Sequence, residues 1–227
     1  MESVYWAAGG TGFTFLMTTL GASVVLFFKK GTTAGMQRIF LGFAAGVMTA
    51  ASVWSLLIPA IEEAEAAGWP GWIPAAGGFV LGVAFLMLLD GLLPHLHPGA
   101  KDPEGARTDL KRTTLLVFAV TLHNIPEGIS VAMPVWYATG SRRRAFRCTL
   151  LSGLTEPVGA VLAFALLRPF LNGLLLGVLF GAVAGIMVYI AVEELIPSSR
   201  QYGHDRPALW ATLCGICVMP LTHLFQT

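Results

Sequence analysis

Long apolar stretches separated by short polar segments dominate this chain of 227 residues. No charged side chain occurs between Glu2 and Lys29, and four further stretches share this property. Each is long enough for a membrane-spanning helix, which needs about 20 apolar residues. Two more apolar stretches are interrupted only by His123, Glu127 and Glu156. The pattern predicts seven transmembrane spans, at residues 4–28, 37–61, 72–94, 113–137, 147–168, 170–195 and 207–225.

The composition agrees with this pattern. The chain is 55% hydrophobic and only 12% charged, with a mean hydropathy of +0.70, which leaves too little polar surface to cover a soluble globule. We therefore expect an all-α fold, a polytopic transmembrane helix bundle formed by one domain over residues 1–227. The 14 basic and 13 acidic residues nearly cancel, so net charge gives no reason to expect a nucleic-acid partner.

An internal repeat is visible within these spans. Residues 45–48 (AGVM) and 57–59 (LIP) resemble residues 184–187 (AGIM) and 195–197 (LIP), and their spacing agrees to within one residue. Such pairs are typical of transporter folds built from repeated units. The alternative is a repetition of composition alone, because close helix packing in membranes favours small residues.

Basic residues test the topology, because Lys and Arg in short loops concentrate on the cytoplasmic side. If the segment 113–137 crosses the membrane once, 8 basic residues lie on the cytoplasmic side and 6 on the outer side. If the segment returns to the side on which it started, 13 lie on the cytoplasmic side and only Arg168 on the outer side. The 28 residues of 113–140 cannot hold two full spans. We therefore expect either a short re-entrant hairpin, broken near 124–128, or the absence of one helix.

The polar residues inside the apolar spans are candidates for metal binding. On a helix, His123 and Glu127 share one face with Asn124 beside them, and both Glu127 and Glu156 have a proline as neighbour. A carboxylate at membrane depth costs about 2.5 kcal/mol or more and usually marks an ion path. Imidazole, amide and carboxylate ligands suit zinc, iron, manganese or cadmium. The alternative is a polar cluster that only holds helices together.

Other residues have simpler interpretations. Met48 is a supplementary soft ligand or, as for most lone methionines on apolar helices, part of the core. Asp90, Glu193 and Glu194 lie at the ends of predicted spans, where we expect their carboxylates to reach toward the membrane surface. An intramembrane hydrolase that uses Glu127 as a base is disfavoured, since the sequence contains neither an H-E-x-x-H motif nor a nucleophile elbow.

These motifs together resemble those of the ZIP (Zrt/Irt-like) divalent-metal transporters, in particular their compact bacterial zinc-uptake branch. The segment TLHNIPEGISVAMPVWYATGSRRRAF, followed by LSGLTEPVGA and AGIMVYIAVEELIP, carries the resemblance. It implies an eight-helix bundle with inverted repeats and a mid-membrane metal site. It also implies uptake of zinc or related ions into the cytoplasm, a homodimer, and a place in the bacterial inner membrane. By this resemblance His123, Asn124, Glu127, Glu156 and Met48 are metal ligands, and the protein is not an enzyme and needs no cofactor besides the metal it carries.

One departure from the family pattern concerns the same motif. The family carries a motif of the HNxPEG type on two helices, whereas this chain has it once. The residues before the motif look like the start of the fourth family helix, and those after it look like the end of the fifth. We therefore expect one metal, bound through His123, Glu127 and Glu156. Two hypotheses remain, a metal transporter or a shortened, non-transporting metal-binding or scaffold relative, and metal uptake distinguishes them.

Overall fold

The computed structural model describes residues 2–27, 33–92, 124–201 and 205–223, and within these ranges every regular element is a helix. The expected all-α membrane bundle is confirmed. The elements are α1 (Glu2–Phe27), α2 (Ala34–Ala51), η1 (Ser52–Leu57), α3 (Ile58–Ala66), α4 (Trp72–Leu92), α6 (Asn124–Thr139), α7 (Arg142–Leu167), η2 (Arg168–Phe170), α8 (Gly173–Tyr189), η3 (Ile190–Leu195), α9 (Ile196–Arg200) and α10 (Asp205–His223).

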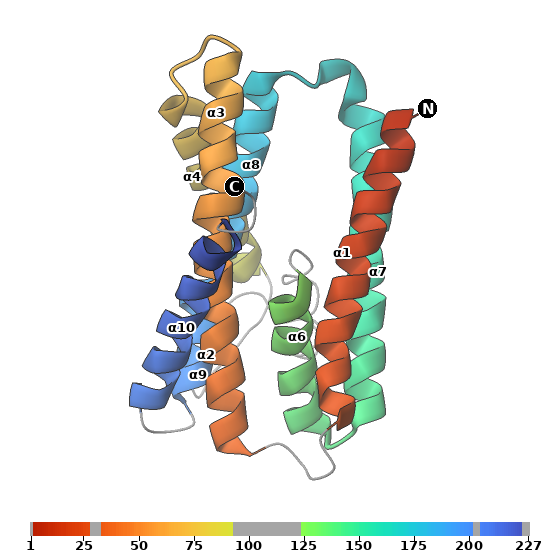
Figure 1. Cartoon of the computed structure of the whole chain (residues 1–227), viewed down its shortest axis with the longest axis vertical. Helices are drawn as coiled ribbons and strands as arrows, with labels where there is room; N and C mark the ends of the chain where they lie inside the picture. The colour runs from red at the N-terminus through yellow and green to blue at the C-terminus, as the bar shows by residue number, and fades with distance from the viewer. Residues whose placement is uncertain (1, 28–32, 93–123, 202–204, 224–227) are drawn as a thin grey trace.

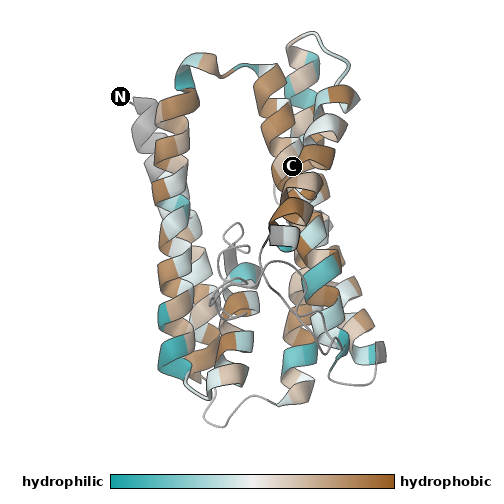
Figure 2. Ribbon diagram, turned by 180° about the vertical axis from the view of Figure 1, so that it is seen from behind, coloured by the Kyte–Doolittle hydropathy of each residue, from teal (hydrophilic) through white to brown (hydrophobic). Residues whose placement is uncertain are grey.

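Four helical segments are long and apolar enough to cross a membrane by length and composition. They are Ala34–Ala66, Trp72–Gly91, Arg142–Phe170 and Gly173–Arg200. Their outer faces carry large apolar side chains that the protein itself leaves uncovered, as on α7, where Leu151, Leu154, Val158, Leu162 and Leu166 are 48–72% exposed. Figure 2 shows these apolar residues along both columns of helices, with hydrophilic residues concentrated near the ends. A bilayer provides the solvent that such faces require.

The helices form two packed groups (Figure 1). In the first group α1 packs against α6 and α7, and in the second α4 packs against α8 and α2 packs against α10. Glycine permits close approach in the second group, since a Cβ added at Gly82 would lie 2.0 Å from Ala182 O and one at Gly46 would lie 2.0 Å from Thr212 O. Helix α6 also packs against α2 and so joins the two groups.

The internal repeat expected from the sequence is present in the fold. Helix α2 with η1 and α3 rises from the lower to the upper end of Figure 1, whereas α8 with η3 and α9 descends, so the two copies are antiparallel. Each copy contains a six-residue π-helical turn, η1 or η3, directly before the shared Ile-Pro. Because Pro59 and Pro197 lack an N–H, each removes one helical hydrogen bond, and a π turn is a common local adjustment to such a loss.

The described part of α6 lies in the lower part of the molecule. Its 16 residues correspond to about 24 Å of rise, against about 30 Å of hydrocarbon. This part runs from mid-height to the lower end of Figure 1, where it lies beside the C-terminal end of α1. The sequence predicts a span over 113–137, and its first part, residues 113–123, lies outside the described residues.

A tight turn joins α6 to α7 and fixes the next helix. Gly140 has φ +65°, a left-handed conformation that favours glycine, and its N–H donates to Trp136 O at 2.8 Å. Ser141 then caps α7, its hydroxyl accepting from Arg144 N at 3.3 Å. The basic N-terminal turn of α7 therefore lies at the same end of the molecule as the end of α6.

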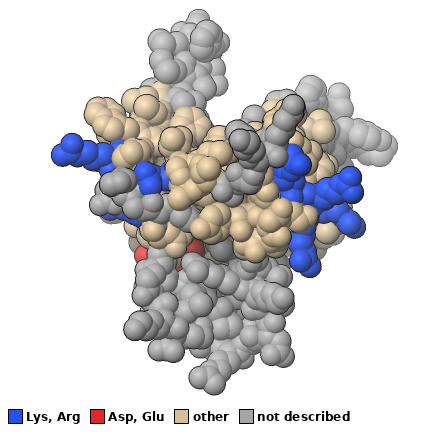
Figure 3. Space-filling model, turned by 90° about the horizontal axis from the view of Figure 1, so that it is seen from below, with Lys and Arg blue, Asp and Glu red and all other residues tan. Residues whose placement is uncertain are grey.

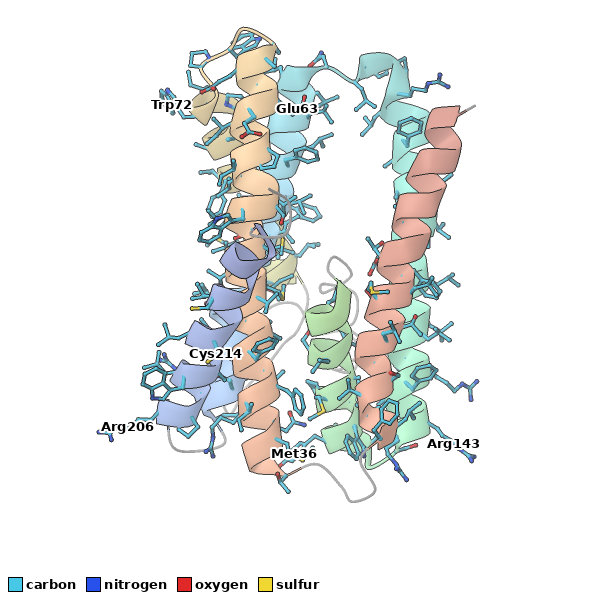
Figure 4. All side chains as sticks on the ribbon, in the orientation of Figure 1. Met36, Glu63, Trp72, Arg143, Arg206 and Cys214 are labelled. Atoms are coloured by element: carbon cyan, nitrogen blue, oxygen red, sulfur yellow. The ribbon has the colours of Figure 1, made fainter. Side chains whose placement is uncertain are left out.

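The charge distribution now agrees with the even number of crossings expected from the sequence. Met36, Arg143 and Arg206 lie at the lower end of Figure 4, and Glu63 and Trp72 lie at the upper end. Seen from below in Figure 3, arginine side chains lie on two sides of this end. Of the basic residues in the described part of the chain, Arg168 alone, in η2, belongs to the opposite end.

We expect impermeant thiol reagents to distinguish these two ends. In a background without Cys148, Cys214 and Cys217, Arg143→Cys and Arg206→Cys should react from the same side of the membrane and Glu63→Cys from the other. The measurement is maleimide labelling of intact cells and of inverted vesicles. Labelling of Arg143→Cys from the same side as Glu63→Cys would contradict the position of the α6–α7 turn at the end of the molecule that holds Arg206.

Candidate metal centre

Glu127 lies in the first turn of α6 and is 2% exposed. A helix carries partial positive charge at its N-terminal end, so a carboxylate is favoured in this turn. Ser130, one turn later, donates its hydroxyl hydrogen to Glu127 O at 2.8 Å, and Pro134 inside the helix leaves Ser130 O without its usual N–H partner. The local sequence therefore places a buried carboxylate on a helix that a proline loosens.

Glu156 belongs to α7 and is half-buried. Thr18 of α1 donates its hydroxyl hydrogen to Glu156 Oε1 at 3.1 Å, a contact between residues 138 positions apart. Pro157 follows inside the helix and leaves Gly153 O without its usual N–H partner. Glu156 is therefore held by a helix other than its own, at a point where its own helix is loosened.

The backbone of α1 brings the helices of both glutamates together. A Cβ added at Gly128 would lie 2.1 Å from Thr18 O, and one added at Gly153 would lie 3.3 Å from Thr18 Cγ2. Gly128 follows Glu127, and Gly153 lies one turn before Glu156. The three-helix contact at Thr18 thus places the two sequence-predicted carboxylates on neighbouring helices.

Met48 is 3% exposed and lies in the apolar core between α2, α4 and α8. Its neighbours in that cluster include Met187, its counterpart in the repeat, and Val131 of α6. Val131 lies one turn after Glu127, on the same face of α6. Met48 therefore approaches the helix that carries Glu127, and its surroundings are those of a core methionine.

The remaining sequence-predicted ligands are less fully described. Asn124 is the first residue of α6, and His123 lies outside the described residues. Among the residues that the structure describes, no three His, Cys, Asp or Glu side chains lie close enough together to hold a metal ion. Glu127 and Glu156 are thus the pair available in this region, and a complete metal site needs the part of the chain that contains His123.

Asp90 differs from the expectation that it reaches toward the membrane surface. Tyr189 of α8 donates its phenolic hydrogen to Asp90 Oδ2, and both side chains are only partly exposed. Asp90 therefore links α4 to α8. The position of Asp90 at the end of a predicted span did not indicate this hydrogen bond, because only the antiparallel packing of α4 on α8 brings Tyr189 within reach of Asp90.

Comparisons with known proteins identify the family to which this chain is similar. The family model described as ZIP Zinc transporter matches residues 105–222. The zinc transporter ZupT of Lysinibacillus sphaericus is 32% identical, with 97% of each chain covered. The zinc transporter ZupT of Chlorobium chlorochromatii is 33% identical over 100% of this chain and 99% of its own, and that of Nitratidesulfovibrio vulgaris is 32% identical over 98% and 97%.

These relatives contain residues that this chain lacks. The alignment with the Lysinibacillus protein extends over 262 positions, whereas this chain has 227 residues, so at least 35 positions face a gap in this chain. A difference of this kind is what the loss of a stretch between two copies of the HNxPEG motif requires.

The close contact between Gly128 of α6 and Thr18 of α1 can be tested by substitution. Gly128→Ala should lower the thermal stability of the purified protein, since a Cβ 2.1 Å from Thr18 O must displace α6 from α1, and overpacking costs about 1–3 kcal/mol. Gly159→Ala on α7 is the control, because a Cβ there meets nothing within 4 Å. Equal melting temperatures for the two variants in detergent would contradict the close approach of α6 and α1.

Proposed function

The chain belongs to the ZIP zinc transporter family, and from this premise we propose that its cargo passes through a site at the meeting of α1, α6 and α7. Family membership makes the protein a membrane transporter of divalent metal ions, of which zinc is the foremost, and not an enzyme. Our proposal adds the location of the ion path. Glu127 and Glu156 are its central residues.

The observation that carries this proposal is the convergence of the two carboxylate-bearing helices on one residue of α1. Glu127 is buried on α6, its neighbour Gly128 lies against the carbonyl oxygen of Thr18, and Glu156 of α7 accepts a hydrogen bond from the hydroxyl of Thr18. Carboxylates are rare at membrane depth, and those present usually face the bundle interior and mark a path for ions. Discontinuous helices that begin near the midplane are the common means of forming such sites in transporters.

We propose His123 and Asn124 as the ligands that complete the site around one metal ion. The imidazole nitrogen and carboxylate oxygens form a donor set that zinc favours, and the same set accepts iron, manganese or cadmium. Met48 is proposed as a supplementary soft ligand, supported by its contact with the cluster that includes Val131 of α6. A buried thioether adapts readily between packing and metal contact.

The charges assign the sidedness of the protein, and the resemblance to zinc-uptake proteins supplies the direction of transport. The end that holds Arg143 and Arg206 is assigned to the cytoplasm, because basic residues are retained there. Metal uptake then proceeds from the end of Glu63 toward the end of Arg143. We place the protein in the bacterial inner membrane as a homodimer, on the strength of its resemblance to bacterial zinc-uptake proteins.

Zinc uptake into proteoliposomes that hold this chain alone tests the site. The parent should show saturable uptake, and Glu127→Ala and Glu156→Ala should each reduce it by about tenfold or more, the effect expected of groups that hold or orient a metal. Glu63→Ala is the control, because it removes a carboxylate from the exposed face of α3. All variants are compared at equal reconstituted amount.

The same uptake measurement also tests the second candidate function, that of a non-transporting metal-binding protein. A parent chain with no uptake above empty vesicles, but with retained zinc binding, would mean that the shortened chain is a non-transporting metal-binding relative. Uptake by Glu127→Ala and Glu156→Ala equal to that of Glu63→Ala would mean that the ion path lies elsewhere.

A further inference from the structure

Thr18 differs from three other hydroxyl residues of its helix, Thr14, Thr19 and Ser23, in the acceptor of its hydroxyl hydrogen. Thr14, Thr19 and Ser23 of α1 donate to the backbone oxygens of Thr11, Phe15 and Leu20 at 2.8, 2.8 and 2.6 Å. Such back-bonding within the helix is the usual choice for Ser and Thr. Thr18 instead donates to Glu156 Oε1 on α7, at 3.1 Å. Its hydroxyl is thus committed to another helix.

The position of Thr18 is fixed from three sides. The side chain is 3% exposed, its carbonyl oxygen faces Gly128 of α6, and its Cγ2 faces Gly153 of α7. A threonine on a helix has few χ1 rotamers available, so close neighbours leave the hydroxyl little freedom. Thr14, one turn earlier, donates its hydroxyl hydrogen to Thr11 O.

We infer that Thr18 is a positioning residue for metal transport, which orients the Glu156 carboxylate toward the cargo ion. The inference rests on the proposed function of Glu156. A carboxylate has two oxygens and about four acceptor positions, so a hydroxyl bound to Oε1 fixes the plane of the group and leaves acceptor capacity for a cation. Partners of this type, behind the direct ligands, set ligand orientation and change metal affinity by about 10–100-fold.

The first span contributes no charged or metal-binding residue to the site, so its part in transport is indirect. Through Thr18, α1 contacts the helices of both Glu127 and Glu156 with a single residue. A displacement of α1 relative to α7 would break the bond to Glu156 and change the orientation of its carboxylate. The structure thus assigns α1 a role in the affinity of the site as well as in its packing.

The test compares the concentration dependence of zinc uptake in four variants of the full chain. Thr18→Val keeps the shape and removes the hydroxyl, and should raise the KM for zinc by about tenfold. Thr18→Ser keeps the hydroxyl and should stay within about twofold of the parent. Thr19→Val is the matched control, because its lost hydroxyl bonds only to its own helix, and Glu156→Ala reports on the site itself. KM does not depend on the amount of active protein, so a loss of folded yield does not imitate the effect.

Two outcomes would overturn the inference while the proposed site stands. One is a Thr18→Val variant with the KM of Thr19→Val although Glu156→Ala has lost uptake. The other is a Thr18→Ser variant with a KM raised as far as that of Thr18→Val, since packing alone would then explain both changes. Full uptake by Glu156→Ala would instead overturn the proposed function of Glu156, and the role of Thr18 with it.

Discussion

A carboxylate at membrane depth must be covered by protein, because hydrocarbon offers no partner for its charge. Glu127 of α6 is 2% exposed, and protein covers its helix on several sides. Residues 127–133 are all buried, with α1 and α7 on one side and α2 on the other. The arrangement of the two helix groups follows from this need to cover α6, and so does the position of the carboxylates.

Coverage of α6 depends on small residues at the crossing points. Gly128 allows α6 to reach the backbone of α1, and Gly153 allows α7 to reach Thr18. Buried Gln37 of α2 adds a polar contact on the other side, donating from Nε2 to Met133 O at 2.8 Å. The same small residues that allow close packing of α6 therefore bring the carboxylate-bearing helices together.

The inverted repeat supplies the frame for this unusual region. Its two copies place equivalent methionines, Met48 and Met187, in one apolar core, and each copy passes through a π turn before its Ile-Pro. Helix α6 packs against the first copy through the contact of Val131 with the core that contains Met48. A regular frame with one irregular helix beside it is consistent with alternating access, in which one packed group moves relative to another around a fixed site.

The sequence by itself determined the class of protein and predicted the chemistry of the site. Apolar length alone identifies the spans, because a bilayer of fixed thickness requires it. Intramembrane carboxylates stand out for the same reason, since burial makes Glu127 and Glu156 costly unless they have a function. The distribution of basic residues also favoured an even number of membrane crossings between 113 and 137. The reason is that Lys and Arg in short loops stay on the cytoplasmic side whatever the local secondary structure.

Only the tertiary structure decided which faces of these helices meet. Helices such as α7 and α8 are apolar around most of their circumference, so periodicity does not distinguish a lipid-facing side from a packed one. The bond from Thr18 to Glu156, the bond from Tyr189 to Asp90, and the clearance at Gly128 join residues far apart in the chain. These contacts depend on how the helices are placed relative to one another. A threonine or glycine in an apolar span does not indicate which helix it will contact.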